Sequence, residues 1–354
     1  MEIFKGKLNL DFVGKRYIAF AISGICILAT VVLLVIRGGP NYGVDFAGGV
    51  VIQVKLEKKH APAEIRDALK STELEDSIIQ EFGEKDAFEY LIRLTNPDVR
   101  VAGLGDEVQK ALNSKLGEKV DIRQVEMVGP QVGEELRKKA LYAIFYAMLM
   151  MAVYISGRFE QKWLMSAIMA GSLIAATSVA ALLGIGVTWL IFVALAVSVA
   201  LCWFMKLKYA MGAIVSLMHD VFVIIGAFAL TDREVSLSTV AALLTVVGYS
   251  LNDNIVIFDR IRENLGRLRK KPFMEIINVS INETLSRTIL TGTTTLIVLI
   301  VLLIFGGPVI HDFAFALLIG VVTGTYSSIY VASPILLLWE GKSTQSGKNS
   351  RPQG

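Results

Sequence analysis

The sequence is poor in charged residues. Only 19% of its 354 residues are Asp, Glu, Lys or Arg, and 54% are hydrophobic, whereas soluble domains carry about 25% charged and about 45–50% apolar residues. This balance excludes a soluble enzyme and a disordered chain, and it predicts an integral membrane protein. The net charge of +3 is too small to carry information by itself, and we expect no nucleic-acid partner.

Cysteine and histidine are scarce as well. Cys26 and Cys202 both lie inside apolar runs, which argues against a disulfide framework. The three histidines, His60, His219 and His311, are far apart in the sequence, so a zinc site built from them is not expected. No phosphate-binding loop and no catalytic motif occur, and we therefore expect neither a metal, nor a cofactor, nor an enzyme.

Long runs without charge predict the membrane spans. A transmembrane helix needs roughly 20 mostly apolar residues, and the first such run is 17–36. It exceeds the apolar core of a secretory signal, about 7–15 residues, so we expect a retained helix. Between Lys162 and Lys206, 43 uncharged residues predict two helices folded at 184–186. Eight spans are expected in all, the others being 140–156, 209–230, 235–258, 288–305 and 313–339.

The distribution of Lys and Arg orients these spans. With the tail 1–16 in the cytoplasm, 17 basic residues fall in cytoplasmic segments and only Arg233 falls in the short outside loops, as the positive-inside rule requires. The segment 37–139, which holds 19 of the 32 acidic residues, is then extracytoplasmic, and the tail 340–354 is cytoplasmic. A six-span alternative, in which 163–205 does not cross the membrane, gives the same orientation.

The outside segment has the pattern of a small α+β domain. Alternating or apolar runs predict strands, and apolar residues at helical spacing predict two helices between them. The order is β-α-β-β-α-β, which is the ferredoxin-like arrangement. The expected elements are strands at 50–56, 77–82, 88–94 and 120–128, and helices at 61–74 and 101–116.

Asp253 stands out within the expected spans, because ionisable residues inside membranes are costly and are functional candidates. It follows 18 uncharged residues, with Ser250 one helical turn earlier and Asn252 beside it. The alternative is a buried acid with a structural role. Arg287 opens the next span, and Thr291 follows it one turn later. An Asp–Arg pair between the two spans is geometrically plausible, and the alternative for the arginine is an interfacial anchor.

His219 and Asp220 lie in the middle of the 209–230 span. They either extend a polar path through the membrane or pair with another helix. A carboxylate in a low dielectric tends to hold its proton, whereas a nearby arginine favours the charged form. Alternation between two such surroundings is how a proton relay could work.

Several motifs resemble the SecD/SecF family. The segment from Gly43 to Gly49 is similar to the entry motif of that family, and the segment from Gly248 to Asn264 looks like its long and specific SecF signature. Further agreement lies at 285–292, 305–308 and 327–333. With the outside domain, the resemblance covers nearly the whole chain. One departure is the intervening stretch 161–208, in which 163–205 is interpreted as an inserted helical hairpin.

The resemblance implies an accessory subunit of the Sec protein translocase in the cell inner membrane. It implies a SecD-like subunit, the SecYEG channel, preprotein and membrane lipids as partners, and a proton gradient as the energy source. Asp253 falls on the family's essential membrane acid and Arg287 on its paired basic residue. Two alternatives stay open: a proton-driven exporter of small molecules or lipids of the same resistance-nodulation-division superfamily, and a passive channel scaffold.

Overall fold

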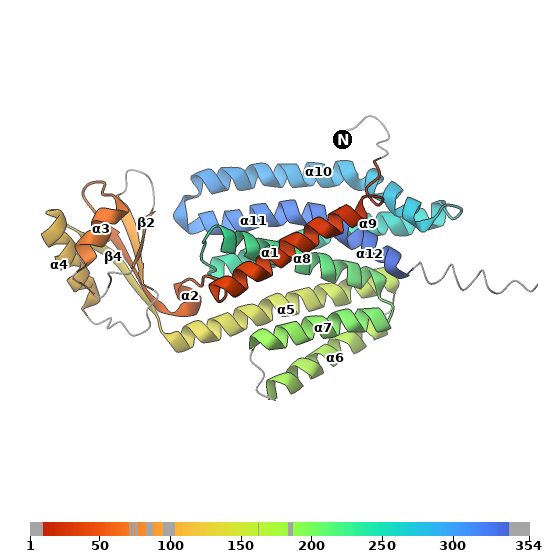
Figure 1. Cartoon of the computed structure of the whole chain (residues 1–354), viewed down its shortest axis with the longest axis horizontal. Helices are drawn as coiled ribbons and strands as arrows, with labels where there is room; N and C mark the ends of the chain where they lie inside the picture. Colours follow the sequence, from red (N-terminus) through yellow and green to blue (C-terminus); the bar gives the residue numbers. More distant parts are fainter. Residues whose placement is uncertain are drawn as a thin grey trace, which may run out of the picture.

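The computed structural model describes residues 10–70, 72, 74, 77–82, 88–94, 103–161, 163–182 and 187–339 (Figure 1). Residues 1–9 of the predicted N-terminal tail, the whole predicted tail 340–354 and the expected turn at 184–186 lie outside the described residues. The chain has a small sheet domain at one end and a long helical bundle beside it (Figure 1). We call the bundle end next to the sheet the sheet-side end, and the opposite one the far end.

The sheet domain has its strands and helices in the predicted order. All neighbouring strands are antiparallel, and their order across the sheet is β2-β3-β1-β4. The first strand is therefore central, and the last strand lies at an edge. The elements are β1 (Gly49–Lys55), α3 (Pro62–Leu69), β2 (Ile78–Phe82), β3 (Glu89–Leu94), α4 (Leu104–Leu116) and β4 (Asp121–Val128).

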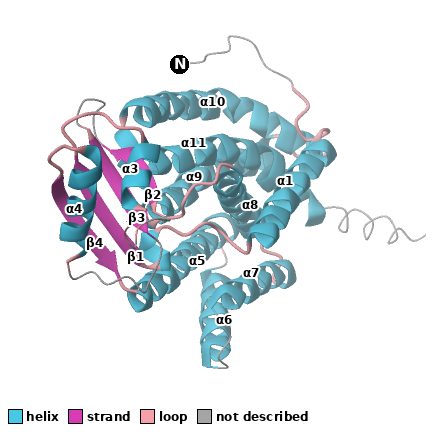
Figure 2. Cartoon of the chain, turned by 60° about the vertical axis from the view of Figure 1, so that its left-hand side comes forward, coloured by secondary structure: helices cyan, strands magenta, loops and turns pink. Residues whose placement is uncertain are grey.

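The two faces of this sheet differ because strand side chains alternate in direction. Ile52 and Ile92 point to one face and are fully buried against Ile65 and Leu112 of the two helices. The intervening residues of the same strands, such as Gln53 and the arginine at 93, line a cleft on the other face. Helices α3 and α4 cover the side away from the bundle, so the second face is turned toward the bundle (Figure 2).

A narrow neck, residues 40–48 and 128–133, joins the sheet domain to the bundle. It contains the short helix α2 (Val44–Ala47). Gly48 has a φ of +80°, and a Cβ there would lie 3.1 Å from the Pro130 Cα. A Cβ on Gly133 would lie 3.0 Å from the Phe46 carbonyl oxygen. The chain entering the domain thus touches the chain leaving it, at two points where an added Cβ would press against backbone atoms.

Six helices of the described chain are long and apolar enough to cross a membrane. They correspond to predicted spans, but several extend well beyond the uncharged windows. The helices are α1 (Arg16–Arg37), α5 (Pro130–Glu160), α8 (Lys208–Leu230), α9 (Leu237–Arg267), α10 (Phe273–Phe305), and α11 (Gly307–Ser327), which continues through a π-helical turn (Ser328–Ala332), α12 (Ser333–Ile335) and a last 3₁₀ turn (Leu336–Trp339).

Burial separates central from peripheral helices. In the apolar stretches of α8, α9 and the last span, 56% of the residues are buried, whereas only 17% are buried in those of α1 and α10. The core of the bundle lies between α5, α8 and α9 and includes Ile155, Leu217 and Phe258. The outer faces of α1 and α10 carry exposed residues such as Ile25 and Ile297.

Two further helices, α6 (Trp163–Leu182) and α7 (Val187–Phe204), occupy the predicted insertion. They lie side by side against α5 (Figure 1). Leu173 and Cys202 are fully buried and belong to the same apolar core as the central helices. These two helices are not among the six candidate spans, so the total of eight spans remains a prediction.

Candidate functional site

Asp253 lies inside α9, about 24 Å along the axis from Leu237 at 1.5 Å per residue. Ser236 caps the start of this helix by a reciprocal arrangement with Thr239, and the helix runs without a break to Arg267. The side of α9 that carries Asp253 is turned inward, because Asp253 is only 3% exposed. The carboxylate oxygen Oδ2 has no hydrogen-bond partner among the described residues. A buried polar atom of this kind needs water or another chain to satisfy it.

Helix α10 packs along α9 and brings Arg287 toward this carboxylate. Arg287 interacts electrostatically with Asp253, but no direct ion pair joins them in the part of the chain that the structure describes. The arginine itself is exposed on α10. Asp253 and Arg287 thus interact electrostatically without a direct ion pair among the described residues, and Arg287 is exposed at the surface of the bundle.

The space between α9 and α10 near Asp253 is polar. Thr291 lies one turn beyond Arg287, and its hydroxyl donates to the Arg287 carbonyl at 3.0 Å. The Tyr249 side chain of α9 lies beside Thr291. The Thr288 hydroxyl is buried and has no partner among the described residues. This region therefore offers several hydroxyl groups, besides the two charged residues, that water could join.

A second buried acid, Asp220, lies on α8 and is fully satisfied. Its Oδ2 accepts hydrogen bonds from the Ser250 hydroxyl of α9 at 2.6 Å and from the Ser327 hydroxyl of α11 at 2.9 Å. Its Oδ1 lies 3.1 Å from His219 Nδ1. Side chains of three helices thus converge on one carboxylate, so Asp220 does pair with other helices. A polar path through the membrane stays a prediction.

The two acids are linked through α9. Ser250, which contacts Asp220, precedes Asp253 by one turn, and Asn254 follows it with a 2.9 Å hydrogen bond from Nδ2 to the Ser216 hydroxyl of α8. Asn252, which the sequence analysis grouped with these residues, is exposed. Side chains at successive helix positions point in directions about 100° apart, so Asn252 faces away while its neighbours face inward.

Some residues of this cluster were not among the predicted site residues. Ser327 was noted only as part of the family-like stretch 327–333, yet its hydroxyl donates to Asp220. Tyr326 lies with its ring centroid 5.8 Å from that of His219. The available signal was a run of polar residues, 325–328, inside the last span, where polar groups need partners.

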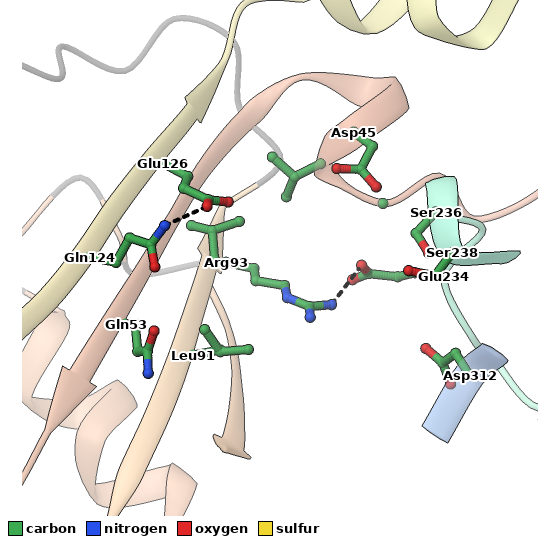
Figure 3. Close-up of a pocket in the computed structure, with 13 residues that line it drawn as sticks. Asp45, Gln53, Leu91, Arg93, Gln124, Glu126, Glu234, Ser236, Ser238 and Asp312 are labelled. Carbon is green, nitrogen blue, oxygen red and sulfur yellow. Dashed lines mark hydrogen bonds and ion pairs between the residues drawn. The ribbon is translucent and has the colours of Figure 1, made fainter. Parts of the chain in front are cut away.

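A second feature is a cleft of about 380 Å³ between the open face of the sheet and the sheet-side end of the bundle (Figure 3). Arg93 of β3 crosses it and pairs with Glu234 at 3.2 Å. Glu234 belongs to the loop 231–236 between α8 and α9, which we call the junction loop. Figure 3 shows this pair spanning the cleft, with Asp45 and Asp312 on the bundle side.

Burial of Glu234 raises the pKa of its carboxyl above the ordinary glutamate value. Arg93 acts in the opposite direction, while Asp312 and Asp45 add to the rise. Because the effect of burial on this pKa outweighs the effect of Arg93, Glu234 holds its proton more tightly in the cleft than it would in water. Sequence reasoning had no means to pair these residues, because 141 positions separate Arg93 from Glu234.

Within the described residues, no group of three His, Cys, Asp or Glu side chains could hold a metal ion.

Comparisons with known proteins bear on the whole of this arrangement. The family model "Protein export membrane protein SecD/SecF, C-terminal" matches residues 108–197 and 171–342, a range that includes Asp253, Arg287 and the Asp220 cluster. The model "SecD/SecF GG Motif" matches residues 32–59, which include the neck segment 40–48 and strand β1. The chain belongs to the SecD/SecF family.

Relatives within this family match almost end to end. "Protein translocase subunit SecF" of Thermodesulfovibrio yellowstonii is 37% identical over 98% of this chain and 97% of its own length. The protein of the same name from Magnetococcus marinus is 41% identical over 96% of this chain and 95% of its own length. That of Escherichia coli O157:H7 is 36% identical over 95% of this chain and 90% of its own length.

Solved structures of the family share the fold. The crystal structure of SecDF from Thermus thermophilus, described as a translocon-associated membrane protein, matches 96% of this chain with a TM-score of 0.68 and 30% identity. SecDF in the super-membrane-facing form matches 99% of this chain with a TM-score of 0.61 and 30% identity. This chain spans only 40% and 41% of those two chains. Family membership and the long apolar helices make it a multi-pass membrane protein.

Proposed function

We propose that this protein is an accessory subunit of the Sec translocase in the cell inner membrane, and that it uses the proton gradient to promote preprotein translocation and release. Relatives that match nearly end to end are named as translocase subunits, and the matched solved chains are SecDF. Those solved chains extend well beyond this one, which supports a SecD-like subunit as its partner. The SecYEG channel and the preprotein are the further partners of this proposal.

One observation carries the proton-driven part. Asp253 is 3% exposed, and its Oδ2 has no partner among the described residues. Arg287 is within electrostatic reach but not in direct contact. A carboxylate in this position can take up a proton or lose it to water without first breaking an ion pair. Moving one charge across the membrane is worth about 2.3 kcal/mol per 100 mV, enough to bias two conformations that differ by a few kcal/mol.

The proposal includes an arrangement in the membrane. The N-terminal and C-terminal tails are cytoplasmic, and the segment 37–139 is a ferredoxin-like domain on the other side. Its strand order, β2-β3-β1-β4, supports the ferredoxin-like assignment. The chain crosses eight times if the hairpin 163–205 spans, once with 17–36 and seven times with the bundle 140–339. We place the hairpin toward lipid or another subunit.

The test is preprotein release from membrane vesicles, with and without a proton gradient, for the wild type and Asp253→Asn. The substitution preserves the shape of the side chain and removes the titrating group. We expect the gradient-dependent part of release to disappear in the variant, while co-purification with the SecD-like subunit is unchanged.

A matched control is Asp259→Asn. Asp259 lies on the same helix, pairs with Arg158 at 2.8 Å and has a side chain that is 46% exposed. We expect this variant to retain gradient-dependent release. If Asp253→Asn also retains it, the proton-driven role is wrong and a passive scaffold is the better account. If a gradient drives export of a small molecule or lipid but not of preprotein, the exporter alternative replaces the proposal.

A further inference from the structure

The junction loop contacts a different part of the molecule at almost every residue. In order along the loop, Asp232 pairs with Arg37 of α1, Arg233 with Asp312 of α11, Glu234 with Arg93 of β3, and Val235 with Asn41 and Gly43 of the neck. Leu237, the first residue of α9, contacts Asp45 of α2. Sheet domain, neck and membrane helices therefore meet at the start of the helix that carries Asp253.

The contacts to the neck are made by backbone groups. The Val235 N–H donates to the Asn41 carbonyl at 2.7 Å, and the Gly43 N–H donates to the Val235 carbonyl at 3.0 Å. Next to them, Asp45 Oδ2 accepts a 2.9 Å hydrogen bond from the Leu237 N–H. These three adjacent hydrogen bonds, two between backbone groups and one to the Asp45 side chain, attach the neck compactly to the start of α9.

The contact of the junction loop to the sheet is different, because among the described residues it is one ion pair across the cleft. Elsewhere the sheet also meets the bundle, where α11 packs near β2. The Arg93 and Glu234 side chains are 22% and 12% exposed, and the cleft of about 380 Å³ lies around them (Figure 3). Gln53 and Gln124 line the sheet wall of the cleft. Surfaces that meet and part in water are usually polar, since exposing apolar area to water is unfavourable.

Helix α9 connects this region to Asp253. It starts one residue after Ser236 and remains one continuous helix past Asp253. A tilt or shift of α9 in the membrane therefore moves the junction loop with it. The attachment at Val235 follows such a movement, whereas the ion pair at Glu234 must lengthen or break if the sheet does not move equally.

We propose that the Arg93–Glu234 pair is a releasable latch, which opens and closes as the sheet domain turns about the attachment of Val235 to Asn41 and Gly43. This inference rests on the proposed function, because movement of α9 during proton transfer is what would open the latch. Arg93 and Glu234 are positioning residues: they contact neither the proton nor the preprotein, and they act through the position of the sheet domain.

The test is a reversible tether across the latch. Arg93→Cys and Glu234→Cys are combined in a Cys26→Ser background, because Cys26 is exposed and Cys202 is buried. A short bifunctional methanethiosulfonate reagent joins the two thiols through disulfides, and mass spectrometry of peptides verifies the link. We expect tethering to reduce gradient-dependent preprotein release to the level of Asp253→Asn, and we expect reduction of the disulfides to restore it.

The matched control uses the same double variant with a monofunctional methanethiosulfonate, which modifies both thiols without joining them. We expect this protein to keep gradient-dependent release, which separates tethering from loss of the ion pair. If the tethered protein releases preprotein as fast as this control, the latch proposal is wrong and the proposed function is untouched. If the wild type itself shows no gradient dependence, the proposed function fails first.

Discussion

Ser250 donates a 2.6 Å hydrogen bond to Asp220, one helical turn before Asp253. Both residues of this bond are fully buried. The bond ties α9 to α8 at a defined rotation, and that rotation turns Asp253 toward the inside of the protein. Asp220, whose carboxylate has hydrogen-bond partners, thus orients the helix that carries Asp253, whose Oδ2 has none among the described residues.

The first prediction concerns this bond. Ser250→Ala removes one of two hydroxyl donors to Asp220 Oδ2, and we expect it to lower the free energy of unfolding by about 1–3 kcal/mol, because a buried acceptor loses a partner. Denaturant unfolding of the detergent-solubilised protein measures the change. Ser238→Ala is the control, since Ser238 is exposed on the first turn of the same helix. Equal stabilities of the two variants would contradict the prediction.

Ser327 offers an independent check, because it donates to the same oxygen atom at 2.9 Å. The double variant Ser250→Ala/Ser327→Ala should not show the sum of the single effects, since both donors serve one carboxylate. We expect an interaction free energy of about 0.5–3 kcal/mol between the two sites. Strict additivity would mean that the two hydroxyls act separately.

The second prediction concerns the neck. In Gly133→Ala the new Cβ lies 3.0 Å from the Phe46 carbonyl oxygen, so the two neck segments must separate. We expect a loss of about 1–3 kcal/mol in the free energy of unfolding. Gly129→Ala is the matched control in the same neck, because nothing lies within 4 Å of its added Cβ. The control should stay within about 1 kcal/mol of the wild type; a larger loss there than at Gly133 would refute the close-approach argument.

The third prediction is a pH dependence of the closed cleft. The pKa of Glu234 is raised in the closed state, so closing takes up protons. The closed state is the one in which Arg93 and Glu234 are in contact. The stability that protonation of Glu234 gives to this state is fully present below the ordinary glutamate pKa of about 4.3, and it is lost as pH rises through the raised pKa of Glu234. The charged groups that act on Glu234 are Arg93 from β3, Asp312 from α11 and Asp45 from α2.

Hydrogen exchange of the backbone amides at 233–237 measures this effect. The ratio of exchange rates between the wild type and Glu234→Gln at each pH cancels the chemical pH dependence of exchange. We expect that ratio to rise with pH over the window above about 4.3, because only the wild type loses a proton there. A ratio that is independent of pH would show that Glu234 does not titrate with closing.

The fourth prediction concerns the N-terminal segment at the far end. Asn278 of α10 accepts hydrogen bonds from the Phe12 and Val13 N–H groups at 2.9 and 3.3 Å, and its Nδ2 donates to the Leu10 carbonyl at 2.9 Å. Asn278→Ala should loosen this segment, which Asn282 of α10 still binds at Leu10, and should speed tryptic cleavage after Lys15. The exposed Asn252 supplies the control, because Asn252→Ala leaves the segment bound. Equal cleavage rates in the two variants would show that Asn278 does not hold the segment.

Patterns of short range were the predictable part of the fold. The strands of the sheet domain and α1 follow from alternation and from one uncharged run, and they lie close to their predicted positions. The ends of the helices were harder to predict from the sequence. Helix α10 begins at Phe273 rather than near 288, and α5 begins at Pro130 rather than near 140. Charge ends a membrane window but does not end a helix, whose backbone hydrogen bonds continue outside the bilayer.

For the site, single residues were predictable and their partners were not. Asp253 could be singled out because a carboxylate in an apolar run is rare, although its role remains a prediction. The binding of Asp220 by Ser250 and Ser327, and the Arg93–Glu234 pair, join residues 30, 107 and 141 positions apart. Such distances carry no periodic pattern in one sequence, so only the folded chain brings these residues together.

The junction loop has a consequence for protein engineering. Surface loops commonly tolerate insertions, because few of their residues have fixed partners. In this loop, Asp232 to Val235 each contact another part of the chain, and one inserted residue would shift every following partner by a position. The length of this connection should therefore be invariant, and a tag or fluorophore belongs elsewhere, for example near Lys270 in the turn between α9 and α10.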